Sequence, residues 1–214
     1  MQIGKAVLDA AAVLLPVECA CCGRPDRRLC ADCRARLAPA PLRSEVGGLA
    51  VHSGAPYRGV VRDALIALKV RARVDVAGAL APLLVTALGG LLGELDAEPV
   101  RLIVVPPTGA ALRERGFRPV EEVLRRGGLP AHRALALTRA TTDQSGLGRE
   151  QRAANLQGAM RATAPMSGQR AVIVDDILTT GATLAEAARA LSQAGATVLG
   201  AVTIAAARRE TAAR

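Results

Sequence analysis

The sequence predicts an α/β fold in which helices flank a mainly parallel sheet, preceded by a small cysteine-rich module. Short aliphatic runs alternate with amphipathic segments over residues 44–214, which is the pattern of parallel strands joined by helices. Tyr57 and Phe117 are the only aromatic residues, so Ala, Val, Leu and Ile must form the core. All five cysteines lie within residues 19–33. We therefore expect two units, residues 1–43 and residues 44–214.

Hydrophobic periodicity and turn residues set the expected order of the elements. Near the N-terminus, apolar residues recur at helical spacing from Ile3 to Leu14, and Asp9 interrupts what would otherwise resemble a signal peptide. We expect an amphipathic helix there. The other expected elements are a strand at 49–54, helices at 57–70 and 76–92, a strand at 101–105, a helix at 118–128, strands at 133–138 and 171–175, a helix at 181–194 and a strand at 197–206.

One apolar run has to be weighed as a possible membrane span. Residues 76–92 carry no charge and reach the lower limit of about 17 residues for a spanning helix. Pro82 and three glycines interrupt the run, so a buried core helix is the better interpretation. We therefore expect no membrane span and a cytoplasmic protein.

The charge is strongly basic. A net charge of +9 arises from 26 Arg and 2 Lys against 19 acidic residues. Such a surface permits binding to phosphates or nucleic acid, but no basic run is long enough to require it. The six arginines within residues 24–43 could equally form a solvated face.

The cysteines form two closely spaced pairs. Cys19, Cys22, Cys30 and Cys33 follow the pattern C-x2-C-x7-C-x2-C. Four thiolates complete a tetrahedral zinc shell and leave no open position, so the site would be structural. Cys21 could replace Cys19 or Cys22 as a ligand. A disulfide-stapled loop is the alternative, and a reducing cytosol argues against it.

The stretch "AVIVDDILTTGAT", residues 171–183, suits a sugar phosphate. Asp175 and Asp176 follow an aliphatic strand, and sites in parallel sheets form at the carboxyl ends of strands. The next loop offers backbone N–H groups and hydroxyls at the start of a helix, where anions bind. The stretch lacks the G-K-[ST] ending of a Walker loop. It also lacks the G-x-G-x-x-G pattern of a dinucleotide-binding fingerprint. A ribose 5-phosphate fits both halves, with its hydroxyls on the carboxylates and its phosphate on the loop.

The same stretch resembles the phosphoribosyl pyrophosphate signature of type I phosphoribosyltransferases. More narrowly, the chain resembles the ComF family, which joins an N-terminal zinc ribbon to that fold. The resemblance covers nearly the whole chain. Besides the cysteine cluster and residues 171–183, it includes "YRGVVRDALIALK" from Tyr57 to Lys69, "VVPP" followed by "RERGF", and "TTDQSGLGREQRAANL".

The resemblance implies a type I phosphoribosyltransferase-like domain that binds phosphoribosyl pyrophosphate with magnesium. It implies that Val105 and Pro106 begin the pyrophosphate loop and that residues 139–152 form a hood over the site. From the residues alone, Arg113 and Arg115 could also be surface partners of nearby glutamates. The binding residues expected in total are Asp175, Asp176, Thr179, Thr180, Gly181, Ala182, Thr183, Val105, Pro106, Arg115 and Arg152.

Two functions from different classes follow. In the first, the protein is a phosphoribosyltransferase that transfers phosphoribosyl to an acceptor, although neither His52 nor His132 stands out as an acceptor base. In the second, it is a non-catalytic phosphoribosyl pyrophosphate-binding protein of competence and DNA uptake. Its partners would then be single-stranded DNA or recombination proteins, although few aromatic residues are available for base stacking. A homodimer is also among the expected assemblies.

Overall fold

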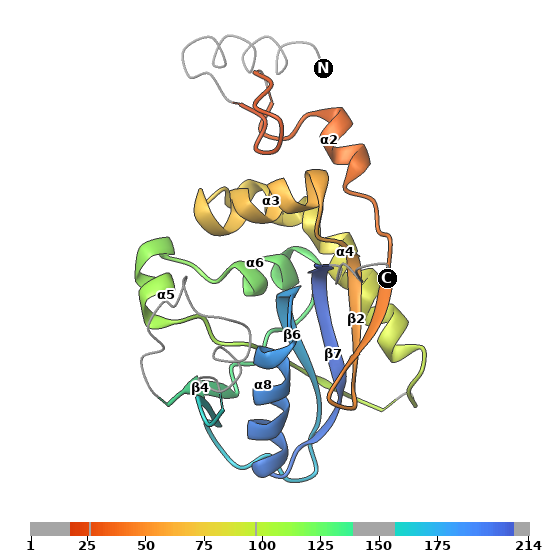
Figure 1. The fold of residues 1–214 in the computed structure, drawn as a ribbon, viewed down its shortest axis with the longest axis vertical. Coiled ribbons are helices and arrows are strands. Elements are labelled where there is room, and N and C mark those ends of the chain that lie inside the picture. The colour runs from red at the N-terminus through yellow and green to blue at the C-terminus, as the bar shows by residue number, and fades with distance from the viewer. Residues whose placement is uncertain (1–17, 26, 97, 139–156, 208–214) are drawn as a thin grey trace, which may run out of the picture.

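The computed structural model describes residues 18–25, 27–96, 98–138 and 157–207 (Figure 1). The expected N-terminal helix and the expected hood, with Arg152, lie outside these residues.

A five-stranded sheet forms the centre of the protein, in the order β1-β2-β7-β6-β3. Only β1 runs antiparallel to its neighbour, and all other neighbouring strands are parallel. The mainly parallel α/β sheet is therefore confirmed. The strands are β1 (Leu42–Val46), β2 (Leu49–Pro56), β3 (Arg101–Val104), β6 (Arg170–Leu178) and β7 (Thr197–Ala206).

Each face of the sheet has its own core, because side chains alternate between the two faces along a strand. Val172 and Val174 of β6 pack with α3, α4 and α6, whereas Ala171 and Ile173 pack with α8. Burial on both faces explains the continuous aliphatic run of β6. The helices are α3 (Gly59–Val70), α4 (Ala77–Leu92), α5 (Gly109–Arg115), α6 (Pro119–Arg126) and α8 (Ala182–Gln193).

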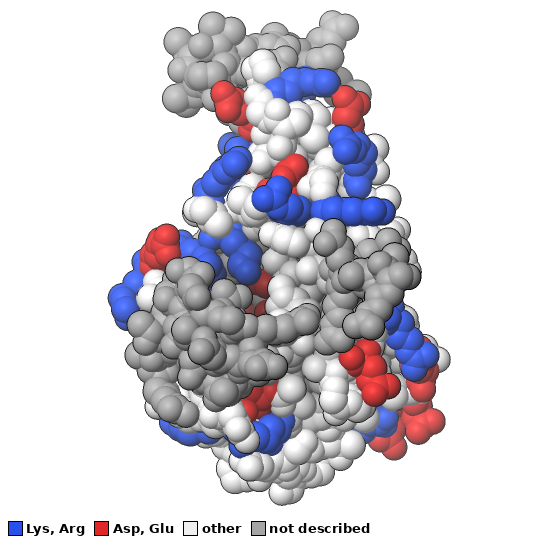
Figure 2. All heavy atoms as spheres, viewed as in Figure 1, with Lys and Arg blue, Asp and Glu red and all other residues white. Residues whose placement is uncertain are grey.

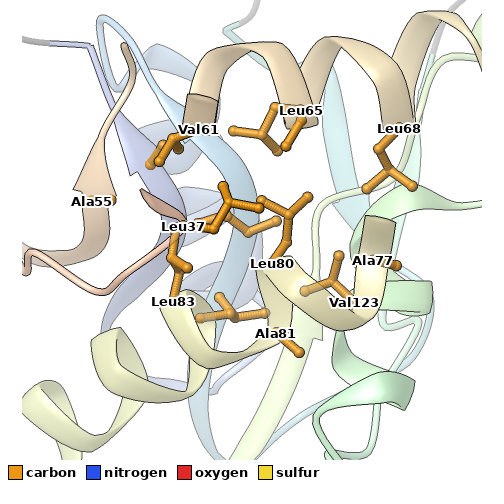
Figure 3. Close-up of a cluster of buried hydrophobic side chains, with 14 of the residues drawn as sticks. Leu37, Ala55, Val61, Leu65, Leu68, Ala77, Leu80, Ala81, Leu83 and Val123 are labelled. Carbon is orange, nitrogen blue, oxygen red and sulfur yellow. The ribbon is translucent and has the colours of Figure 1, made fainter. Parts of the chain in front are cut away.

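The larger core lies between α3, α4 and α6 (Figure 3). Leu65 and Leu68 of α3 face Leu80 of α4, and Val123 of α6 lies beside them. All four side chains are fully buried. Burying one leucine stabilises a fold by about 1.5–3 kcal/mol, so these contacts hold α3 firmly over the sheet.

Helix α4 is the buried helix expected at 76–92. With the short turn η1 (Val74–Val76) it is long and apolar enough, by length and composition alone, to cross a membrane. It packs against β2, β7 and α6, and 56% of its most apolar stretch is buried inside the protein. These contacts are those of a core helix.

A second, two-stranded antiparallel sheet consists of β4 (Leu135–Leu137) and β5 (Met160–Ala162). The strand expected at 133–138 is therefore present, but it does not join the main sheet. Leu135 and Met160 share the core of α8 instead. The sequence did not predict β1, β5 or α5, because each is too short to display a clear period.

The cysteine-rich region lies at one end of the molecule, beyond α3 (Figure 1). Its helix α2 (Ala31–Arg36) packs against α3. The chain then enters the main sheet at Leu42, the first residue of β1. The division into residues 1–43 and 44–214 stays a prediction.

Candidate functional site

A cavity of about 400 Å³ opens where β3 ends and β6 continues. Its walls come from α3, from the turn after β3, from α5 and α6, and from the loop before α8. The cavity brings together most of the binding residues expected from the sequence. Those that line it are Val105, Pro106, Arg115, Asp175, Asp176, Thr179 and Thr183.

Asp175 and Asp176 lie on β6 beyond the point at which β3 stops. β3 ends at Val104, which pairs with Val174, whereas β6 continues alongside β7 to Leu178. The expectation that the aspartates end their strand is therefore wrong, because pairing with β7 extends β6. The end of β3 leaves one edge of β6 open at the two carboxylates, and the cavity lies there.

The surroundings of Asp175 disfavour its charged form. Burial is the main cause and the charge of Asp176 adds repulsion, so the pKa of Asp175 rises from an ordinary 3.8 to about 7. The backbone N–H of Asp176 donates to Asp175 Oδ1 at 2.8 Å and, with the charge of Lys69, partly opposes this rise. A carboxyl group that titrates near neutral pH is typical of functional sites.

Lys69 from the last turn of α3 reaches the same carboxylates. Its Nζ lies 2.9 Å from Asp176 Oδ2, and the two side chains are 27% and 18% exposed. Sequence reasoning noted Lys69 only as the end of a motif and assigned it no role. Composition carried a usable signal, since Lys69 is one of two lysines among 28 basic residues.

The loop before α8 is held by its own side chains and by β1. Thr180 Oγ1 accepts the backbone N–H of Ala182 at 3.3 Å, so this hydroxyl caps the loop and does not line the cavity. Gly181 has a φ of +84°, and an added Cβ would lie 2.5 Å from the Val46 side chain. The loop therefore requires glycine here. Thr179 and Thr183 are the loop residues that line the cavity.

The turn after β3 forms the opposite wall. Val105 continues toward β6 by donating its N–H to the carbonyl of Val174 at 3.0 Å. Thr108 caps α5 by accepting the N–H of Ala111 at 3.2 Å. Arg115 at the end of α5 lines the cavity.

The structure shows whether Arg113 and Arg115 of α5 pair with nearby glutamates. Glu121 forms ion pairs with Arg118 and Arg133. Within the described residues, neither Arg113 nor Arg115 has an ion-pair partner. Arg115 therefore presents a charge to the cavity that no carboxylate of the described chain neutralises.

The cysteine quartet forms a second site. The Sγ atoms of Cys19, Cys22, Cys30 and Cys33 all lie within 4.8 Å of one another, and those of Cys22 and Cys30 are 3.8 Å apart. A tetrahedral zinc ion with bonds of about 2.3 Å separates its sulfurs by about 3.8 Å, so the donor set fits zinc. Four cysteines are thus positioned to hold a metal.

The fifth cysteine stands apart from this quartet. Cys21 packs against the larger core, and burial raises the pKa of its thiol to about 11. In Cys19, burial is outweighed by backbone N–H groups, chiefly that of Cys30, which lower the thiol pKa to about 6. The sulfur positions group the four regularly spaced cysteines and leave Cys21 outside the group.

Arg73 joins the quartet to the rest of the protein. Its guanidinium donates to the carbonyls of Glu18 at 3.2 Å and Arg28 at 3.0 Å, both in the cysteine-rich region. Asp75 orients the same group through hydrogen bonds of 2.9 and 2.8 Å. The segment that follows α3 is thereby tied to both sides of the metal site.

Sequence comparisons identify the family of this chain. A profile described as "Phosphoribosyl transferase domain" matches residues 87–214. The "DNA utilization protein YhgH" of Escherichia coli O157:H7 is 32% identical over 199 residues, covering 83% of this chain and 84% of that protein. Its counterpart in Escherichia coli K12 is 31% identical over the same shares. The chain belongs to the phosphoribosyl transferase domain family and, within it, to the ComF family.

Solved structures resemble this ComF-family protein only distantly. An adenine phosphoribosyltransferase is 15% identical with a TM-score of 0.40, covering 81% of this chain and 89% of that one. A hypoxanthine phosphoribosyltransferase from Staphylococcus aureus is 14% identical with a TM-score of 0.36, covering 66% and 71%. Likenesses this distant carry no argument about function.

The histidines of this ComF-family protein lie away from the cavity. His52 is buried on β2, with its Nε2 3.5 Å from Glu94 Oε1. His132 forms a bridge beside Ile103 of β3. Neither lines the cavity.

Proposed function

We propose that the protein binds 5-phosphoribosyl 1-pyrophosphate with magnesium in the cavity beside β6. The observation that carries this proposal is the pair Asp175 and Asp176 at an open strand edge, with a Thr/Gly loop and the start of α8 on one side. The carboxylates would accept the ribose hydroxyls. Backbone N–H groups of the loop, with Thr179 and Thr183, would bind the 5-phosphate.

The turn after β3 and Arg115 would receive the pyrophosphate. An unpaired guanidinium suits a phosphate group, and the turn supplies a backbone donor at Thr108. Arg152 is a further proposed partner. Bound magnesium would supply neutralising charge to the pyrophosphate.

Transfer of the phosphoribosyl group is the reaction that this arrangement supports. The bond from C1 of ribose to pyrophosphate would break, pyrophosphate would leave with its electron pair, and an acceptor would form a new bond to C1. The protein would contribute positioning and charge stabilisation, because no described histidine lines the cavity.

The experiment that tests the proposal is calorimetric titration of phosphoribosyl pyrophosphate with magnesium. Wild-type protein should bind, and the double variant Asp175→Asn/Asp176→Asn should lose binding while it stays folded. Asp96→Asn, which alters an exposed carboxylate away from the cavity, is the matched control. No binding by the folded wild type would overturn the proposal.

A second candidate function is DNA binding, which the relatives' name, DNA utilization protein, suggests. A groove of about 390 Å³ between α2 and α3 is lined by Arg36 and Arg58, and neither forms an ion pair within the described residues. Figure 2 shows further basic side chains around this end of the molecule. We propose this groove as the contact for single-stranded DNA, in a competence or DNA-uptake role.

Salt-dependent binding of a single-stranded oligonucleotide tests this second function. Arg36→Gln/Arg58→Gln should weaken binding and flatten the salt dependence, by a slope of roughly 0.7 per lost phosphate contact. The control is Arg101→Gln, which changes an exposed arginine at the first residue of β3, outside the groove, and should have little effect. An unchanged salt slope in the double variant would exclude the groove.

We propose that the cysteine quartet holds one structural zinc ion. The regular spacing and the sulfur separation both support this assignment. We propose a cytoplasmic location as well, because a reducing interior keeps the cysteines free to hold the metal. The expected homodimer remains a prediction. Metal analysis of the purified protein should give one zinc per chain.

A further inference from the structure

Lys69 is an unassigned charged residue in the cavity wall. Among the described residues it is the only part of α3 that lines the cavity. The helix holds it there through Leu65 and Leu68, both fully buried. Its ion pair with Asp176, at 2.9 Å, is partly shielded from water because both side chains are largely covered. An ion pair in such a place interacts more strongly than one on an open surface.

We propose that Lys69 is a positioning residue for the aspartate pair, which holds Asp176 in place and balances the two carboxylates so that both can accept ribose hydroxyls. This inference rests on the proposed function. Two adjacent carboxylates repel each other and one tends to take up a proton. A protonated Asp175 would donate where the ribose hydroxyl also needs to donate. A fixed positive charge beside Asp176 opposes that outcome.

The other charged groups around the cavity do not perform this task. Glu114 and Arg115 come from α5, Glu121 comes from α6, and Arg118 is the residue just before α6. Arg118 is engaged with Glu121 at 3.6 Å. Arg115 forms no ion pair with either aspartate. Lys69 is thus the only cation among the described residues that touches the aspartate pair.

The choice of lysine at this position also fits the task. The chain uses arginine for 26 of its 28 basic residues, so a cation elsewhere in this protein is almost always a guanidinium. An ammonium is compact and can remain on one carboxylate oxygen while leaving the other free. A planar guanidinium would favour both oxygens of Asp176 and compete with the ribose hydroxyl.

The pH dependence of ligand binding tests the inference. Binding of phosphoribosyl pyrophosphate with magnesium should be measured by calorimetry from pH 6 to pH 9 for wild type, Lys69→Met and Lys69→Arg. Without the positive charge, Asp175 should ionise only at higher pH, so the binding midpoint of Lys69→Met should rise by about one pH unit or more. Lys69→Arg should return the midpoint toward that of wild type. Arg62→Met, exposed on the same helix, should leave it unchanged.

The failures of the two proposals are distinguishable. If wild type does not bind at any pH, the proposed function is wrong. If wild type and Lys69→Met both bind with the same pH midpoint, Lys69 has only a structural role and this inference is wrong.

A measurement without ligand guards against misfolding of the variant. The chain has two lysines, so acetylation by acetic anhydride followed by mass spectrometry can compare Lys69 with Lys5 as an internal reference. Asp176→Asn should raise the relative reactivity of Lys69 several-fold, because its amine loses the ion pair with the carboxylate that it contacts at 2.9 Å. Equal relative reactivity in the two proteins would show that the ion pair is absent in solution.

Discussion

Asp175 lies beside Asp176 at an open edge of β6, and burial raises its pKa to about 7. A carboxyl group with this pKa binds a proton in the folded protein over a range of pH in which the unfolded chain has already released it. The free energy of unfolding should therefore fall as the pH rises from about 4 to about 7. The site retains a charge that is unfavourable for folding and that, in the proposed function, accepts sugar hydroxyls.

The substitution Asp175→Asn should stabilise the protein at pH 8. An amide keeps the acceptor for the Asp176 N–H and removes the charge from this partly buried position, so the free energy of unfolding should rise by at most about 4 kcal/mol. At pH 4 the gain should nearly vanish. Chemical denaturation between pH 4 and pH 8 measures this difference, with Asp96→Asn as the control. A loss of stability at pH 8 would contradict the assigned burial.

At the scale of single elements, α8 links the cavity to two other parts of the fold. Its first residues follow Gly181, which packs against Val46 of β1. One turn further on, the buried Glu186 accepts the backbone N–H of Met160 at 2.9 Å, and Arg189 donates to the carbonyl of Met160 at 2.9 Å. The helix therefore fixes the loop at one end of the site and β5 beside it.

Gly181→Ala should destabilise the protein by more than a left-handed backbone alone explains. The positive φ costs about 1–2 kcal/mol for alanine, and the contact with Val46 adds to it. Gly168→Ala is the matched control, since Gly168 has a φ of +73° and open space around it. Thermal denaturation should show the larger loss for Gly181→Ala. Adding Val46→Ala should bring the two losses close together, and a failure to do so would remove the steric explanation.

Glu186→Gln should weaken the attachment of β5 to α8. Burial raises the pKa of Glu186, but the hydrogen bonds from Arg189 and Met160 outweigh burial, and the pKa falls below its usual value. Stability from this group is therefore present above about pH 4.5 and is lost as the pH falls.

The loss for Glu186→Gln should be about 1–3 kcal/mol at pH 7 and smaller at pH 3. Denaturation at the two pH values measures it, and the exposed Glu45→Gln serves as control. A loss that does not depend on pH would mean that the charge of Glu186 has no part in the attachment.

For the molecule as a whole, the cysteine-rich region and the main domain are joined through Arg73. Its guanidinium contacts carbonyls on both sides of the quartet, and it follows α3, the helix that carries Lys69. The metal site and the cavity are thereby connected through one helix. This arrangement indicates that the proposed zinc ion stabilises more than its own loop.

Arg73→Ala should loosen the proposed zinc site. Two backbone carbonyls lose their charged donor, so the protein should lose about 1–3 kcal/mol of stability and release zinc faster to a chelating dye. Arg71→Ala changes an exposed arginine two residues away and should leave both quantities unchanged. Unaltered zinc release in Arg73→Ala would show that the quartet holds its metal without this contact.

Local patterns in the sequence were sufficient to predict many of the helices and strands of this fold. The aliphatic runs of β6 and β7, the helical spacing of Val61, Leu65 and Leu68, and the paired cysteines each depend on neighbours close in the chain. Periodicity reports such features directly. The short elements β1, α5 and β5 carry too few residues for a period, so tertiary packing determines them.

By itself, the sequence determined the α/β class, the cysteine cluster and the aspartates with their Thr/Gly loop, because each is a property of local residue patterns. Only the tertiary structure decided that β3 stops before Asp175, that Lys69 pairs with Asp176, that Cys21 lies outside the quartet and that Arg73 reaches the metal site. These contacts join segments far apart in the chain. Their formation depends on how helices and strands pack together, which no local pattern of residues records.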